Sequence, residues 1–121
     1  MTTTPPHTVA IIGAGTVGKA LARAVYARGA NVCVYDTDPF ACTPEAILHK
    51  ANLHDTAHTL PTPTLVAALS LSHAAAHAHL MLLTLPTRAT DTGYDMQPFH
   101  DTLTVLQHQR FRHPVVVCST V

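Results

Sequence analysis

Short apolar runs alternate along this chain with segments in which apolar residues recur every three or four positions. The first pattern predicts buried strands, and the second predicts amphipathic helices. We expect strands at residues 7–12, 31–35, 80–85 and 114–119. We expect helices at residues 16–28, 44–52, 64–77 and 96–108, a polar loop over 87–94 and no clear element over 53–63. Alternating strands and helices indicate an α/β fold, with a doubly wound parallel sheet between two helical layers (αβα).

The segment between the first strand and the first helix is rich in glycine. It reads Gly13-Ala14-Gly15-Thr16-Val17-Gly18, and the second strand ends on Asp36. A strand, a glycine loop, a helix, a second strand and an acid in this order are typical of a dinucleotide-binding unit. Gly13 permits a tight turn, Gly15 lets the backbone approach a pyrophosphate, and Gly18 lets the helix pack closely. The pattern predicts a single Rossmann-like domain over residues 1–121.

The ends of the first helix and of the second strand predict which cofactor binds. At the helix N-terminus, free backbone N–H groups and a partial positive charge favour phosphate. A carboxylate at Asp36 accepts hydrogen bonds from the adenosine ribose and repels a 2′-phosphate. We therefore predict NAD rather than NADP. The predicted cofactor-binding residues of this unit are Gly13, Gly15, Thr16, Val17, Gly18 and Asp36.

Composition and charge narrow the range of partners. Of the 121 residues, 47% are hydrophobic and 12% are charged, as in a folded globular domain. Seven basic and seven acidic residues give a formal net charge of zero, so nothing favours nucleic acid or an anionic membrane. No apolar stretch has the length of a signal-peptide core or of a membrane span. We expect a cytoplasmic protein whose ligand is NAD(H).

Two further segments point to one family. They are Leu83-Thr84-Leu85-Pro86-Thr87 and Val115-Val116-Val117-Cys118-Ser119-Thr120-Val121. Together with the glycine loop, they resemble the N-terminal NAD-binding domain of the UDP-glucose/GDP-mannose dehydrogenases, with its "VPTP" and "ESTV" segments. The resemblance implies that Pro86, Thr87 and Thr120 contact the cofactor, and that Thr120 assists beside the nicotinamide.

The resemblance covers almost the whole chain but only about the first third of such an enzyme. The family's cysteine nucleophile and substrate domain lie later, so we expect no catalytic residue here and no turnover of a sugar by the chain alone. A separate substrate domain or a homo-oligomer would be the partner. Two residues depart from the family pattern: Arg88 replaces the second proline of VPTP, and Cys118 replaces the glutamate of ESTV.

Two other functions fit the same glycine loop. A non-catalytic module binds NAD(H) or another adenine nucleotide and reports it to a partner. A dehydrogenase of the 3-hydroxyacid type has the same first unit, but it needs neither the Pro-Thr nor the Ser-Thr-Val segment.

Ten histidines and three cysteines raise the question of a metal site. His54 and His58, like His73 and His77, are spaced to share a helix face. No HExxH motif or cysteine cluster completes a set of zinc ligands, so we expect no bound metal.

Overall fold

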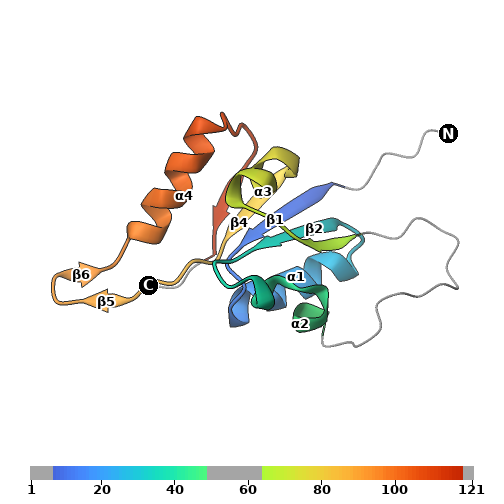
Figure 1. Ribbon diagram of the computed structural model, residues 1–121, viewed down its shortest axis with the longest axis horizontal. Helices are drawn as coiled ribbons and strands as arrows, with labels where there is room; N and C mark the ends of the chain where they lie inside the picture. Colours follow the sequence, from blue (N-terminus) through green and yellow to red (C-terminus); the bar gives the residue numbers. More distant parts are fainter. Residues whose placement is uncertain (1–6, 49–63, 119–121) are drawn as a thin grey trace, which may run out of the picture.

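The computed structural model describes residues 7–48 and 64–118 (Figure 1). Five parallel strands form one sheet in the order β3-β2-β1-β4-β7. The strands are β1 (Thr8–Ile12), β2 (Asn31–Tyr35), β3 (Leu65–Ala67), β4 (Leu80–Leu83) and β7 (Val115–Val117). The helices are α1 (Thr16–Ala27), the 3₁₀ helix η1 (Pro39–Cys42), α2 (Pro44–Leu48), α3 (Leu71–His77) and α4 (Gln97–His108). A separate antiparallel hairpin consists of β5 (Ala89–Thr90) and β6 (Gly93–Tyr94).

Helices cover both faces of the sheet because successive strand residues point in opposite directions. Val9 and Ile11 of β1 lie in one core, together with Ile47 of α2 and side chains of α1. Ala10 and Ile12 lie in a second core, with side chains of α3 and α4. The prediction of a doubly wound parallel sheet in three αβα layers is confirmed.

The first βαβ unit agrees closely with its prediction. β1, α1 and β2 lie within the predicted segments. After α1, Gly29 has a φ of +94°, which favours glycine, and its N–H donates to the Tyr26 carbonyl at 3.1 Å. None of the helices in the described ranges is long and apolar enough to cross a membrane.

The prediction of one helix over residues 64–77 is wrong in part, because only residues 71–77 are helical. The segment forms strand β3 and then helix α3. β3 pairs with β2 at the edge of the sheet, with Val32 opposite Leu65, and only Leu65 of its three residues is buried. The side chain of Ser70 accepts a hydrogen bond from the His73 backbone N–H at 3.0 Å, so it caps the N-terminus of α3. A three-residue edge strand has no alternating pattern to reveal it.

The prediction of a polar loop over residues 87–94 is wrong in part, because this segment contains the β5-β6 hairpin. Ala89 pairs with Tyr94 and Thr90 pairs with Gly93, whose φ of +140° favours glycine. Figure 1 shows the hairpin projecting from the sheet between β4 and the start of α4. Since its residues are exposed and its strands are two residues long, hydrophobic periodicity does not reveal it.

Candidate functional site

The glycine loop lies at the carboxyl edge of the sheet, beside the point where the strand order reverses. β2 and β3 extend the sheet on one side of β1, whereas β4 and β7 extend it on the other. The connections that leave β1 and β4 therefore run to opposite faces of the sheet and leave a crevice between them. Ligands of open α/β sheets bind at such a switch point.

Two glycines of the loop are required by the protein's own structure. Gly13 has a φ of +110°, and a Cβ added there would lie 2.5 Å from the carbonyl oxygen of Thr84. A Cβ added to Gly18 would overlap the Gly13 carbonyl oxygen. The turn and the close packing of α1 on this loop therefore both depend on glycine.

Gly15 has no comparable structural requirement. Its φ is −79°, and no atom lies within 4 Å of a Cβ placed on it. It is the N-cap residue of α1, a helix with no capping side chain and no acidic residue in its first turn. Thr16 and Val17, the first two residues of α1, are exposed. The first turn of the helix is therefore open to an anionic ligand.

Asp36 holds the glycine loop against the end of β2. Its Oδ2 accepts a hydrogen bond from the Ala14 N–H at 2.7 Å, and its Oδ1 accepts one from the Asp38 N–H at 2.9 Å. The Thr37 hydroxyl lies 3.5 Å from Oδ1. Asp36 was predicted only as a ribose ligand, and this second role in loop positioning was not predicted.

Thr84 fixes the same loop from the other side, and the sequence did not single it out. The Thr84 hydroxyl donates to the Gly13 carbonyl at 2.9 Å, and its backbone N–H donates to the Ile12 carbonyl at 2.8 Å. A single polar residue inside the otherwise apolar run 80–85 was the available signal. The loop is thus positioned by β2 through Asp36 and by the residue after β4 through Thr84.

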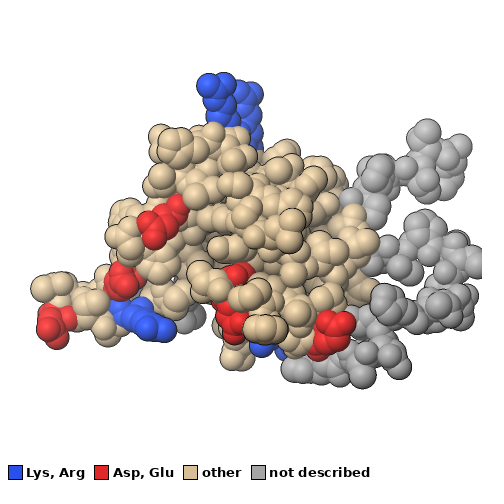
Figure 2. Space-filling model, in the orientation of Figure 1, with Lys and Arg blue, Asp and Glu red and all other residues tan. Residues whose placement is uncertain are grey.

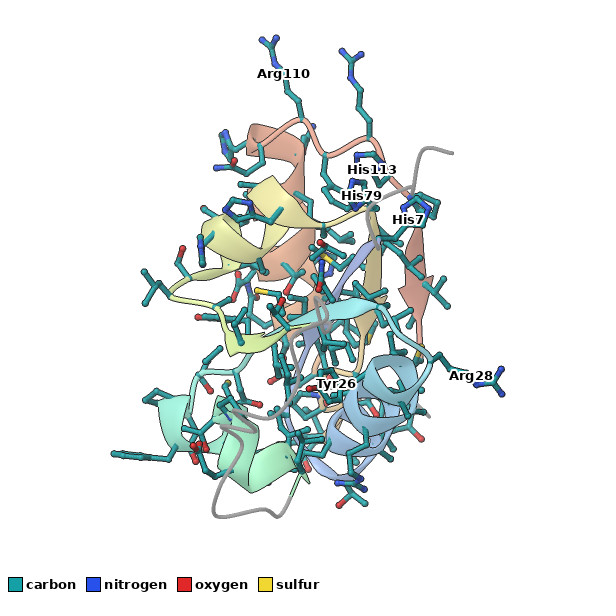
Figure 3. The ribbon with its side chains drawn as sticks, turned by 90° about the vertical axis from the view of Figure 1, so that its right-hand side faces the viewer. His7, Tyr26, Arg28, His79, Arg110 and His113 are labelled. Atoms are coloured by element: carbon teal, nitrogen blue, oxygen red, sulfur yellow. The ribbon has the colours of Figure 1, made fainter. Side chains whose placement is uncertain are left out.

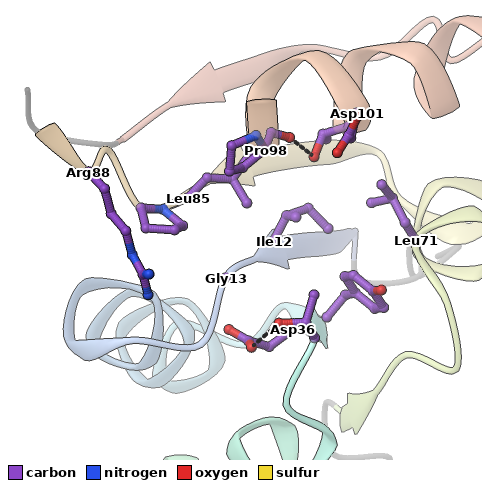
Figure 4. Close-up of a pocket in the computed structure, with 12 residues that line it drawn as sticks. Ile12, Gly13, Asp36, Leu71, Leu85, Arg88, Pro98 and Asp101 are labelled. Carbon is purple, nitrogen blue, oxygen red and sulfur yellow. Dashed lines mark hydrogen bonds between the residues drawn. The ribbon is translucent and has the colours of Figure 1, made fainter. Parts of the chain in front are cut away.

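A cavity of about 540 Å³ opens at this edge, between the ends of β1, β2 and β4 and the first turns of α3 and α4 (Figure 4). Its volume is within the usual range of small-ligand sites. Three of the predicted cofactor-binding residues line it, namely Gly13, Asp36 and Pro86. The apolar side chains of Ile12 and Leu85 form part of its wall.

The remaining predicted site residues lie beside the cavity or beyond the described part of the chain. Gly15, Thr16, Val17 and Gly18 form the loop and the first turn of α1 that continue from Gly13. Thr87 is half-buried and follows Pro86. Thr120 lies outside the described residues.

Several lining residues were not predicted, among them Thr37, Leu71 and Arg88. Thr37 and Arg88 follow strands at their carboxyl ends, and that position was the signal for them. Leu71 comes from a helix whose placement depends on packing against the sheet, so no local pattern indicates it.

Both the surface and the cavity wall carry charged side chains of both signs. On the face shown in Figure 2, acidic and basic side chains are scattered among uncharged residues. Among the described residues that line the cavity, Asp36 and Asp101 are acidic and Arg88 is the one basic residue.

Two cysteines lie in the core close to the site. Burial, together with the Asp36 carboxylate, raises the pKa of the Cys42 thiol to about 11. Burial also raises the pKa of Cys33. Both residues are therefore neutral thiols near pH 7, and buried thiols of this kind are poor nucleophiles.

Histidines gather at the opposite, amino edge of the sheet (Figure 3). The His79 ring centroid lies 5.3 Å from that of His7 and 5.6 Å from that of His113. His79 Nδ1 also accepts a hydrogen bond from the Thr8 N–H at 3.0 Å, and this bond helps to fix the start of β1. Within residues 7–48 and 64–118, no group of three potential ligand side chains is placed to hold a metal ion. His54 and His58 lie outside these ranges.

A family profile described as the N-terminus of NAD-dependent glycerol-3-phosphate dehydrogenase matches residues 8–106. The chain belongs to this family. It is an NAD-binding, dehydrogenase-like domain, and NAD is its cofactor. The profile names a different dehydrogenase from the nucleotide-sugar family that the sequence resembles. No curated protein sequence matches the chain.

Solved structures with this fold come from several kinds of oxidoreductase. A UDP-glucose dehydrogenase from the archaeon Pyrobaculum islandicum has a TM-score of 0.73 at 20% identity, over 96% of this chain and 29% of that one. A GDP-mannose dehydrogenase from Pseudomonas aeruginosa has a TM-score of 0.69 at 21% identity, over 93% and 28% of the two chains. A reductive aminase from Aspergillus terreus, solved with NADPH, has a TM-score of 0.62 at 14% identity, over 96% and 33%. At these identities the likeness shows the fold, and this chain spans about a third of the length of these proteins.

Proposed function

We propose that this chain binds NAD(H) at the carboxyl edge of its sheet and orients it for hydride transfer in an NAD-dependent dehydrogenase. The pyrophosphate lies against Gly13, Gly15 and the first turn of α1, where Thr16, Val17 and Gly18 present backbone N–H groups. The observation that carries the proposal is the environment of Gly15. Neither its φ nor its neighbours require glycine in the free protein, whereas a pyrophosphate resting on the backbone does.

The adenosine ribose binds at Asp36 in this proposal. A carboxylate offers about four acceptor positions, and the Ala14 and Asp38 N–H groups and the Thr37 hydroxyl take three of them. One position remains for a ribose hydroxyl at the cavity wall. The charge of the carboxylate disfavours a 2′-phosphate at the same place, which supports NAD over NADP.

In this proposal residues 1–121 form one cofactor-binding domain. Three residues from its second half, Pro86, Thr87 and Thr120, also contact the cofactor. Pro86 lines the cavity, and Thr87 follows it in the loop after β4. Thr120 comes three residues after β7 and assists at the nicotinamide, as the resemblance to the nucleotide-sugar dehydrogenases implies.

For the whole enzyme we propose a phosphorylated alcohol as substrate. The Leu83–Thr87 and 115–121 segments support a nucleotide sugar, whereas the family profile supports glycerol-3-phosphate. In either case a hydride would pass from the alcohol carbon to the nicotinamide. The residues that bind the substrate would come from a separate substrate domain or from a homo-oligomer.

Titration of the protein with NADH, with NADPH in parallel, tests the proposal. We expect saturable binding of NADH and binding of NADPH at least about 10-fold weaker, because the Asp36 carboxylate meets the 2′-phosphate. The variant Asp36→Asn keeps an oxygen for the Ala14 N–H but loses the charge and the acceptor for the Asp38 N–H. Because the charge is gone, this difference should shrink to less than about 3-fold. Asp101→Asn removes a charge elsewhere on the cavity wall and should leave the preference unchanged.

Two results would change this conclusion. A folded sample that binds no NADH at millimolar concentration contradicts the proposal. NADH binding without turnover of UDP-glucose, GDP-mannose or glycerol-3-phosphate, even in the presence of a substrate domain, would favour a nucleotide-sensing module.

A further inference from the structure

We infer that Arg88, in the loop after β4, binds the cofactor pyrophosphate together with the glycine loop. The inference rests on the proposed NAD(H) site and adds to it a side chain that recognises the dianionic group. Arg88 is the one basic residue among the described residues that line the cavity, and Gly13 of the glycine loop lines the same cavity. In Figure 4 its side chain extends from the loop after β4 toward the side where the glycine loop runs into α1.

The backbone of Arg88 is held in place at the base of the β5-β6 hairpin. Its carbonyl oxygen accepts a hydrogen bond from the Asp95 N–H at 2.8 Å, directly beside the pair of Ala89 and Tyr94. Two residues earlier, Pro86 restricts the backbone that leaves β4. The hairpin therefore fixes where the arginine side chain begins.

The guanidinium of Arg88 is available to a ligand. It makes no hydrogen bond or ion pair with any residue that the structure describes, and it is exposed. The two acids of the cavity have other partners: Asp36 accepts from the Ala14 and Asp38 N–H groups, and Asp101 accepts from Gln97 Nε2 at 2.7 Å. A guanidinium has five N–H donors and matches phosphate oxygens two at a time.

Charge balance in the cavity assigns the arginine to the pyrophosphate. Asp36 and Asp101 give the wall two negative charges, and a dinucleotide pyrophosphate adds two more. The N-terminus of α1 contributes about half a positive charge. Arg88 supplies a full positive charge from the loop after β4, so a dianion would contact both the helix N-terminus and the guanidinium. A 2′-phosphate would instead have to lie beside the Asp36 carboxylate.

The variant Arg88→Gln tests the inference, because it removes the charge and keeps a long polar side chain. We expect the affinity for NADH and for ADP to fall about 10-fold or more, as for other charge-assisted hydrogen bonds. Affinity for adenosine, which has no phosphate, should stay the same. The dependence of NADH binding on salt should weaken, because one ionic contact is lost. Arg112→Gln is the matched control, since Arg112 is exposed and precedes β7 at the opposite edge of the sheet.

The outcomes separate this inference from the proposed function. If the native protein binds NADH and ADP, and Arg88→Gln binds both equally well, the inference is wrong and the NAD site stands. If Arg88→Gln weakens NADPH alone, the arginine faces the 2′-phosphate, and the assignment to the pyrophosphate is overturned. If the native protein binds neither ligand, the proposed NAD site fails and the inference fails with it.

Discussion

Replacing Gly18 with alanine is expected to cost the domain a large part of its stability. The new Cβ would overlap the Gly13 carbonyl oxygen and lie 2.8 Å from Thr84 Oγ1. Because the first of these is a backbone atom in a turn with a φ of +110°, α1 must move away from the loop to make room. Extra atoms in a well-packed site cost about 1–3 kcal/mol, and a clash with fixed backbone belongs at the upper end of that range or above it. We expect a loss of about 3 kcal/mol, out of the roughly 5–15 kcal/mol of a typical domain.

Denaturant unfolding of Gly18→Ala beside Gly15→Ala measures this effect. Gly15→Ala adds the same atom three positions earlier, where nothing lies within 4 Å. That control should lose no more than about 1 kcal/mol, through the poorer N-cap. Equal unfolding midpoints for the two variants would contradict the packing of α1 on the glycine loop.

Aspartate in place of Gly15 is expected to weaken NADH binding strongly and leave the domain folded. In the free protein the side chain fits, since φ is −79° and no atom lies near its Cβ. Aspartate is a preferred N-cap residue, and its charge suits a helix N-terminus, so the unfolding temperature should hold or rise. The same carboxylate would occupy the place of the pyrophosphate, and a contact between like charges costs several kcal/mol. We expect NADH affinity to fall at least about 100-fold.

Calorimetric titration and thermal unfolding of one sample separate the two effects of Gly15→Asp. The control is Ala24→Asp, which adds the same charge to an exposed position of α1 about two turns further along. This control should bind NADH as the native protein does. Native affinity in Gly15→Asp would mean that the pyrophosphate does not approach this loop.

The first βαβ unit could be predicted because its signals are local. The spacing of Gly13, Gly15 and Gly18 follows directly after an apolar strand, and Asp36 ends the next one. The second role of Asp36 was not visible in the same way. Its hydrogen bond to the Ala14 N–H joins residues 22 positions apart, and it depends on the register of β1 against β2.

The secondary structure was predicted wrongly in segments whose conformation depends on contacts with other segments of the chain. β3 is a strand because β2 pairs with it, and two of its three residues are exposed. The β5-β6 hairpin has too few residues to show a period. In the sequence, Arg88 is only a departure from the VPTP pattern, and the cavity that it lines forms when β4, α4 and the glycine loop come together.

The most direct test of NAD(H) binding at the carboxyl edge follows the backbone amide resonances of isotope-labelled protein during the addition of NADH. The largest shifts should come from Gly13 to Gly18, from the residues around Asp36 and from Arg88. The amides of His79 and His113, at the amino edge of the sheet, should stay unchanged. Shifts concentrated at these histidines, with none at the glycine loop, would place the ligand elsewhere and contradict the proposed site.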